Sequence, residues 1–142
     1  MSFLIDTSVI SELVKPSPDK NVVNWMKQED EKTLFLSVLT LGELEKGIAK
    51  LPASKRRTKL ETWVRVDLAN RFRERLLLVD GLVCSTWGKL AGEAENRGEP
   101  LPVIDGLIAA TGLAHHLVIA TRNTADFARF GVTCFDPWIQ SE

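Results

Sequence analysis

Short, mostly apolar runs recur along the chain and alternate with stretches of helical spacing. The runs cover residues 3–5, 34–38, 76–79, 117–120 and 132–135. Continuous apolar runs of this kind are typical of strands that are buried on both faces of a parallel sheet. We therefore predict a central, mostly parallel sheet of about five strands.

The intervals between these runs carry helical signals. The first predicted helix passes through Val9, Ile10 and Leu13, the second begins at Ser17-Pro18, and the third begins at Thr40. Three more predicted helices cover about residues 54–75, 82–96 and 104–115. Serine as a cap with proline in the first turn is a common helix start, and Pro52 separates the third helix from the fourth. Strands that alternate with helices predict an α/β fold whose sheet is covered on both faces. We expect one domain over residues 1–142.

Composition excludes several classes of protein. Of the 142 residues, 44% are hydrophobic and 26% are charged, as in a folded globular protein, and the net charge of -1 excludes a general polycation. Cys84 and Cys134 lack the spacing of a metal or redox motif, so we expect two buried thiols. We expect no signal peptide and no membrane contact, since no apolar run approaches the roughly 20 residues of a membrane span. A cytoplasmic location follows.

Three carboxylates lie at the edges of predicted elements. Asp6 directly follows the first strand, where parallel sheets gather their ligands, and its alternative role is to cap the next helix, which Thr7 or Ser8 could do instead. Glu43 stands three residues after Thr40, so it also matches a capping box. For Glu43 the two roles are evenly balanced on these grounds.

The other candidate site residues are Asp105 and the polar residues of the turn after the fourth strand. Asp105 begins an otherwise uncharged helical stretch and shares a face with Ile108 and Ala109, which predicts a carboxylate near the core that needs a partner. A favourable interaction with the helix dipole is its simpler explanation. Thr121 and Asn123 close the fourth strand, and Asp126 follows, in a pattern that also fits a helix cap.

Carboxylates gathered at one edge of a sheet form a site of hard oxygen ligands. Mg²⁺ or Mn²⁺ prefers such ligands, and Mg²⁺ keeps several of its waters. We expect Asp6 and Asp105 to hold the metal. No cluster of histidines or cysteines is present for zinc. A metal-bound water could attack a phosphodiester, so no serine or cysteine nucleophile is required.

Four motifs in order resemble the PIN-domain family, and more narrowly its VapC-type ribonuclease toxins. They are Asp6-Thr-Ser-Val-Ile10, Leu41-Gly-Glu-Leu44, Asp105-Gly-Leu-Ile-Ala-Ala110 and Thr121-Arg-Asn-Thr-Ala-Asp-Phe127. The terminal Phe135-Asp-Pro-Trp138 is similar to the branch that includes FitB-type proteins. The resemblance covers essentially the whole chain.

This resemblance implies a three-layer PIN fold and an endoribonuclease toxin that depends on Mg²⁺ or Mn²⁺. It also implies a homodimer and a cognate VapB-type antitoxin, through which alone operator DNA would be bound. Asp6, Glu43 and Asp105 match the family's three core acidic positions, and Thr121 matches a frequent hydroxyl of the site. Asn123 stands where many members carry a fourth acid, which favours one metal over two, and Asp126 could replace that acid through water.

Other functions remain open from the sequence. The main alternative is a toxin-like regulatory subunit that binds operator DNA with an antitoxin and has little nuclease activity. A phosphatase or a nuclease acting on DNA would use the same metal chemistry. The segment from Lys50 to Arg75 holds nine basic and three acidic residues, a local charge of +6. This basic segment could contact RNA, contact the antitoxin, or only face water.

Overall fold

Within the part of the chain that the structure describes, five short strands form one parallel sheet, as predicted. The computed structural model describes residues 1–139. The strands are β1 (Phe3–Ile5), β2 (Leu34–Ser37), β3 (Leu76–Leu77), β4 (Val118–Ala120) and β5 (Cys134–Phe135). Their order is β3-β2-β1-β4-β5, and each neighbouring pair is parallel. This order makes β1 and β4 neighbours at the centre of the sheet, although more than 100 residues separate them in the chain.

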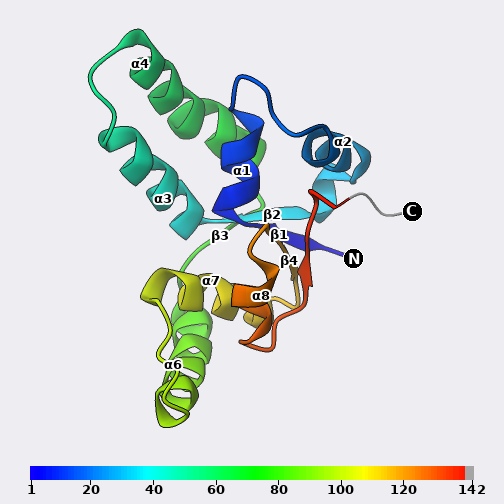
Figure 1. The fold of residues 1–142 in the computed structure, drawn as a ribbon, viewed down its shortest axis with the longest axis vertical. Helices are drawn as coiled ribbons and strands as arrows, with labels where there is room; N and C mark the ends of the chain where they lie inside the picture. Colours follow the sequence, from blue (N-terminus) through cyan, green and yellow to red (C-terminus); the bar gives the residue numbers. More distant parts are fainter. Residues whose placement is uncertain (140–142) are drawn as a thin grey trace.

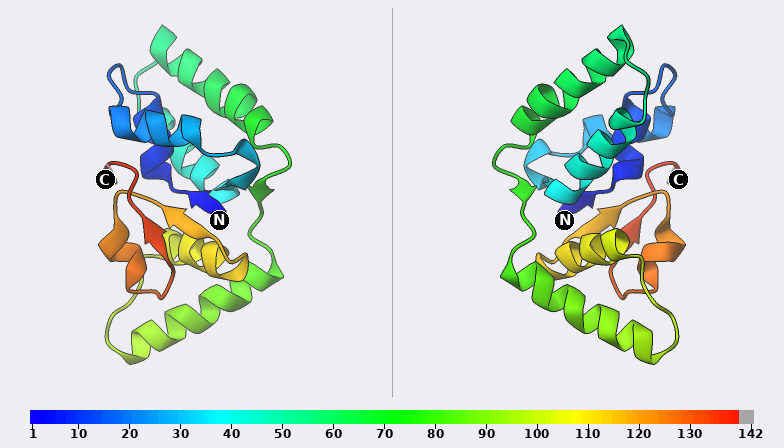
Figure 2. Two further views of the ribbon diagram at one scale, coloured as in Figure 1. Left: turned by 90° about the vertical axis from the view of Figure 1, so that its right-hand side faces the viewer. Right: turned by 90° about the vertical axis from the view of Figure 1, so that its left-hand side faces the viewer.

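Helices cover both faces of the sheet (Figure 1). They are α1 (Thr7–Leu13), α2 (Lys20–Gln28), η1 (Glu31–Thr33), α3 (Val38–Ala49), α4 (Lys55–Thr62), η2 (Trp63–Leu68), α5 (Ala69–Arg71), α6 (Gly81–Asn96), α7 (Val103–Ala114) and α8 (Thr124–Ala128). The helices up to α5 lie on one side of the sheet, and α6, α7 and α8 lie on the other (Figure 2). The result is the predicted three-layer α/β arrangement. Within the described residues, no helix combines the length and the apolar character needed to cross a membrane.

The pleat of β1 divides the core into two clusters. Phe3 and Ile5 point into the cluster under α1, α2 and α3, whereas Leu4 points into the cluster under α7 and α8. Successive residues of a strand face opposite sides of the sheet. A strand covered on both sides must therefore be apolar at every position, which explains the uninterrupted run Phe3–Ile5.

Two helix starts differ from the prediction. The second helix begins at Lys20 and not at Ser17-Pro18, because the Asp19 carboxylate accepts hydrogen bonds from the backbone N–H groups of Asn21 and Val22. The third helix begins at Val38, and the Ser37 hydroxyl caps it by accepting from the N–H of Leu39 at 3.1 Å. A local side chain that satisfies the first N–H groups decides each start.

The long helix expected over residues 54–75 contains a wider turn. Its middle, Trp63–Leu68, is π-helical. Its buried residues Val64, Leu68 and Phe72 repeat every four positions, and this spacing drifts around an α-helix of 3.6 residues per turn. A π-turn has more residues per turn, so it keeps this stripe on the buried side.

The two thiols are more accessible than predicted. Cys84 is exposed and Cys134 is half-buried, so the expectation of two buried cysteines was wrong. Helix α6 turns Val83 into the core, and the next residue along a helix points roughly 100° away from it.

Candidate active site

The candidate site lies where β1 and β4 end. The two strands are in register, with Ile5 opposite Ala120, and the N–H of Asp6 donates to the carbonyl of Ala120 at 2.9 Å. Parallel neighbours end at the same edge of a sheet, and ligands commonly bind beyond that edge. Asp6 and Thr121 are therefore brought side by side by the order of the strands.

Asp6 is held by two hydroxyl groups. The hydroxyls of Thr121 and Ser8 each donate to its Oδ2 at 2.8 Å, and Asp6 is only 5% exposed. Asp6 also occupies the N-cap position of α1, but its side chain caps no N–H of that helix. Within the described part of the chain, its Oδ1 makes no hydrogen bond with the protein. The carboxylate is thus fixed in position and keeps one oxygen available for a ligand.

Glu43 is not part of a capping box. Because α3 begins at Val38, Thr40 and Glu43 both lie inside the helix. Instead, the Thr7 hydroxyl donates to Glu43 Oε1 at 2.6 Å, and it also lies 3.3 Å from the Thr40 hydroxyl. Glu43 is therefore tied to the first residue of α1, next to Asp6.

Asp105 lies in the first turn of α7 and is close enough to other carboxylates to be affected by them. Burial raises the pKa of Asp105, and the carboxylates of Asp6 and Asp126 raise it further, while Arg129 opposes the change. Like charges that destabilise one another in this way lie within a short distance. Three of the predicted acidic residues therefore share one electrostatic environment.

Hydrogen bonds to the hydroxyls of Thr121 and Ser8 hold the turn after β4. The Thr121 hydroxyl, which is fully buried, accepts from the N–H of Asn123 at 3.0 Å, and Ser8 accepts from the N–H of Arg122 at 3.3 Å. Asn123 is the exposed N-cap residue of α8, and its side chain makes no capping hydrogen bond. Asp126 is also exposed, but its charge reaches Asp105. This electrostatic effect favours Asp126 over Asn123 as the fourth polar group of the site.

Thr7 and Ser8 were expected only as helix caps. In the structure, Ser8 instead orients Asp6 and Thr7 orients Glu43. Their signal in the sequence is their position directly after Asp6, where a short side chain in the first turn of a helix points back to the strand end.

The donor set fits a hard divalent cation. Across residues 1–139, no three Asp, Glu, His or Cys side chains stand close enough to form a complete metal cluster by themselves. Mg²⁺ does not need such a cluster, because it is commonly bound by one or two carboxylates and keeps several waters. Asp6 and Asp105 supply two carboxylates, and mutual repulsion between them is what a bound cation would relieve.

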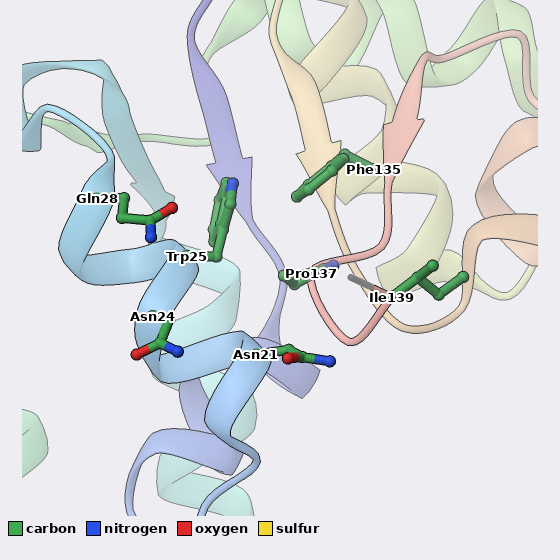
Figure 3. A pocket seen from close by; sticks show the side chains of 7 residues that line it. All are labelled: Asn21, Asn24, Trp25, Gln28, Phe135, Pro137 and Ile139. Atoms are coloured by element: carbon green, nitrogen blue, oxygen red, sulfur yellow. The ribbon is translucent and has the colours of Figure 1, made fainter. Parts of the chain in front are cut away.

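A separate pocket lies between α2 and the end of β5 (Figure 3). It has a volume of about 210 Å³ and is lined by Asn21, Asn24, Trp25, Gln28, Phe135, Pro137 and Ile139. The lining contains amides and apolar groups but no carboxylate or other ionisable side chain. This pocket is therefore not the candidate active site.

Comparisons with known proteins agree with the geometry. A family model described as "PIN domain" matches residues 3–132. "VapC ribonuclease Y4jK" of Sinorhizobium fredii is 36% identical over 95% of this chain and 96% of its own length, and "Toxin FitB" of Neisseria gonorrhoeae is 34% identical over 95% and 97%. The solved "Structure of FitAB bound to IR36 DNA fragment" superposes with a TM-score of 0.90 at 31% identity, covering 99% of this chain and 98% of that one.

Proposed function

The chain belongs to the PIN-domain family, with VapC and FitB toxins among its relatives, and from this membership we propose that it is a metal-dependent endoribonuclease toxin. Its relatives are named as ribonucleases and toxins. The observation that carries the proposal is the fixed carboxylate of Asp6 at the edge where β1 and β4 end, with Glu43 tied to the adjacent Thr7 and with the charges of Asp6 and Asp126 acting on Asp105.

In the proposed mechanism, Asp6 and Asp105 would hold Mg²⁺ or Mn²⁺. The bound ion supplies positive charge that polarises the scissile phosphate and makes water acidic enough to act as the nucleophile. Ser8 and Thr121 keep Asp6 in one orientation. Glu43, held by Thr7, would accept a proton from the attacking water. Asp126 adds negative charge beside Asp105 and so strengthens the attraction of the site for a cation.

Cleavage of RNA by purified protein tests this proposal. We expect cleavage in Mg²⁺ or Mn²⁺, loss of cleavage in EDTA, and recovery when the metal is restored. Asp6→Asn should abolish cleavage, at least about a 100-fold loss, since removing one electrostatic group from an active site commonly costs that much. An unchanged circular dichroism spectrum would establish that the variant is folded. Wild-type rates in Asp6→Asn, or cleavage that EDTA does not affect, would refute the proposal.

A regulatory subunit is the second candidate, because the similar FitAB complex was solved with bound DNA. In that case the protein would occupy operator DNA together with an antitoxin and cleave RNA poorly. Measuring RNA cleavage over a range of metal concentrations distinguishes the two functions. Protein that never cleaves, yet changes the mobility of an antitoxin–operator complex, would support the regulatory function.

We further propose that an antitoxin segment binds a groove between α1, α2 and η2. Two adjoining hollows of about 150 and 460 Å³ share Leu13 and Arg71. Apolar side chains in their walls include Val14, Trp63 and Met26, and Val14 is 36% exposed. An apolar groove with charged residues at its rim suits an amphipathic helix or an extended peptide. Several similar solved structures are toxin–antitoxin complexes, which supports a partner of this kind.

A homodimer is the remaining partner proposal. Leu78 and Leu82, where β3 leads into α6, are 63% and 56% exposed. Neighbouring exposed leucines are a common feature of surfaces that another protein covers. Light scattering of the wild type and of Leu82→Glu measures whether a second copy covers them. A monomeric wild type would contradict the homodimer.

A further inference from the structure

The basic segment from Lys50 to Arg75 separates into two parts in the structure. Most arginines of its later part are neutralised by the protein itself. The ion pairs join Arg57 to Glu61 at 2.9 Å, Arg65 to Glu45 at 3.1 Å, Arg71 to Glu31 at 2.6 Å and Arg75 to Glu31 at 3.3 Å. Among the described residues, the basic side chains of this segment that form no ion pair are Lys50, Lys55, Arg56, Lys59 and Arg73, and all but Arg73 lie around the turn between α3 and α4 or in α4.

Lys46 of α3 and Lys50, the residue that caps the end of α3, share a helix face with Glu43. Lys46 and Lys50 follow Glu43 by three and seven residues, and residues at this spacing lie in one row along a helix. Leu44 and Ile48 face the core on the opposite side. Lys46 and Lys50 are exposed, and among the described residues neither forms an ion pair. A row of positive charge thus leads away from a carboxylate of the candidate site.

Two further basic residues follow the turn that joins α3 to α4. Lys55 and Arg56 begin α4, and both are exposed and without an ion pair among residues 1–139. In Figure 1, α3 runs from the centre of the molecule toward this turn. Beside the row, a Cβ added at Gly42 or Gly47 would meet no atom within 4 Å, so the surface of α3 is open at these two positions.

A polyanion needs such a surface because the site itself is acidic. Asp6, Glu43, Asp105 and Asp126 repel phosphate, so cations outside the site must supply much of the electrostatic attraction. Lys50 lies about 10 Å along the helix axis from Glu43 at 1.5 Å per residue. At about 3.4 Å per nucleotide, the rise of a strand in a duplex, this distance corresponds to roughly three nucleotides, and an extended single strand covers it with fewer.

We propose that Lys46 and Lys50, followed by Lys55 and Arg56, form a track that binds the sugar–phosphate backbone of single-stranded RNA on one side of the cleavage site. The inference rests on the proposed ribonuclease function for its substrate class. The track positions RNA through its phosphates, so it contributes affinity but reads no base.

Binding of a fluorescein-labelled single-stranded RNA, measured by anisotropy without added metal, tests the track. The double variant Lys46→Gln with Lys50→Gln should bind about tenfold more weakly at 0.1 M salt and reduce the slope of log K against log salt by about 1.4, since each single-strand phosphate contact contributes about 0.7. Glutamine is as good a helix former as lysine, so α3 should stay intact. The matched control is Lys32→Gln with Lys89→Gln, which removes two exposed lysines elsewhere and should change neither quantity.

Cleavage provides a second readout. In Mn²⁺, the Lys46→Gln, Lys50→Gln protein should show an increased KM and an unchanged kcat for RNA of about 20 nucleotides, but no change for a dinucleotide, which is too short to reach Lys50. The arginine variants Lys46→Arg and Lys50→Arg should restore binding. Equal losses in the track variant and its control would overturn the proposal, because they would reflect only total charge. Unchanged RNA binding with weakened antitoxin binding would also overturn it.

The two proposals fail in different ways. If the wild type binds RNA through Lys46 and Lys50 but never cleaves it in metal, the ribonuclease function is wrong and the track stands. If the wild type cleaves RNA and the track variant binds and cleaves like the wild type, the track is wrong and the function stands. A wild type that does not bind RNA at all refutes the track directly.

Discussion

The hydroxyl of Thr121 donates a hydrogen bond of 2.8 Å to Oδ2 of Asp6, a residue 115 positions earlier in the chain. Thr121→Val removes this donor and leaves the N–H of Asn123 without its acceptor. We expect a loss of about 1–2 kcal/mol in the free energy of unfolding, because both groups lose a buried partner. Cleavage should decrease about tenfold through misorientation of Asp6, a change equivalent to about 1.4 kcal/mol. Urea denaturation and single-turnover kinetics measure the two effects.

Thr121→Ser is the control for this prediction. Serine keeps the hydroxyl and loses only a methyl group, so it should retain most of the cleavage rate. A Thr121→Val protein that cleaves like the wild type would show that the hydrogen bond does not position Asp6 for catalysis.

Asp105 should reduce stability at neutral pH when no metal is present. Burial and the carboxylates of Asp6 and Asp126 raise its pKa in the folded state. A raised folded pKa means that Asp105 stabilises the fold below its unfolded pKa, near 3.9, and that this contribution is lost as the pH increases through the folded value. Asp105→Asn should therefore increase stability at pH 7 in EDTA, by about 0.5 kcal/mol after solvent screening, and should have no such effect near pH 3.

Thermal unfolding at the two pH values checks this prediction. Added Mn²⁺ should raise the Tm of the wild type, because a ligand that binds only the folded state stabilises it, and should raise that of Asp105→Asn much less. Equal metal-induced shifts in both proteins would mean that Asp105 does not hold the ion.

Asp126 and Asn123 should differ in their importance for cleavage. The charge of Asp126 reaches Asp105, whereas the exposed Asn123 side chain makes no capping hydrogen bond. We expect Asp126→Asn to lower kcat/KM about tenfold and Asn123→Ala to lower it less than about threefold, since only the first removes charge from the site. Steady-state kinetics at saturating Mn²⁺ compares kcat/KM of the two variants. The reverse ranking would assign the fourth position to Asn123.

A charged side chain in the groove between α1, α2 and η2 should weaken antitoxin binding and leave RNA cleavage unchanged. Val14 lies in the wall of the groove and is 36% exposed. Val14→Glu should weaken an antitoxin complex by at least about 2 kcal/mol, because a buried unpaired charge at an interface is costly. Cleavage of RNA by the free protein should not change. Isothermal calorimetry with the antitoxin measures the first effect, and Val14→Leu provides an apolar control that should bind like the wild type.

The strands and the central acidic residues were readable from the sequence because each depends on local pattern. The run Phe3–Ile5 must be apolar throughout, and Asp6 must then stand at its end, so position along the chain already implies position at the sheet edge. Asp105 was recognisable for a similar reason, since it is the sole charge in a long buried helical stretch. The strands are confirmed, and the roles of Asp6 and Asp105 in catalysis stay predictions.

Features that depend on long-range partners could not be read in this way. Thr40 and Glu43 match a capping box by spacing, but Ser37 starts the helix earlier, and Glu43 pairs with Thr7 from another helix. The arginines after Arg57 looked like one basic surface, yet their partners Glu31 and Glu45 belong to other segments of the chain. Such pairs are set by tertiary packing, which a count of charges along the sequence does not contain.

The order of strands has a consequence for the synthesis of the protein. β1 leaves the ribosome first, but its central neighbour β4 and the Thr121 hydroxyl that fixes Asp6 are made more than 100 residues later. Until that segment emerges, one edge of β1 has no partner and Asp6 has only Ser8. A growing chain can therefore already contain Asp6, Glu43 and Asp105 and still lack the hydroxyl that fixes Asp6, so that the candidate site is assembled only after β4 and Thr121 have been made.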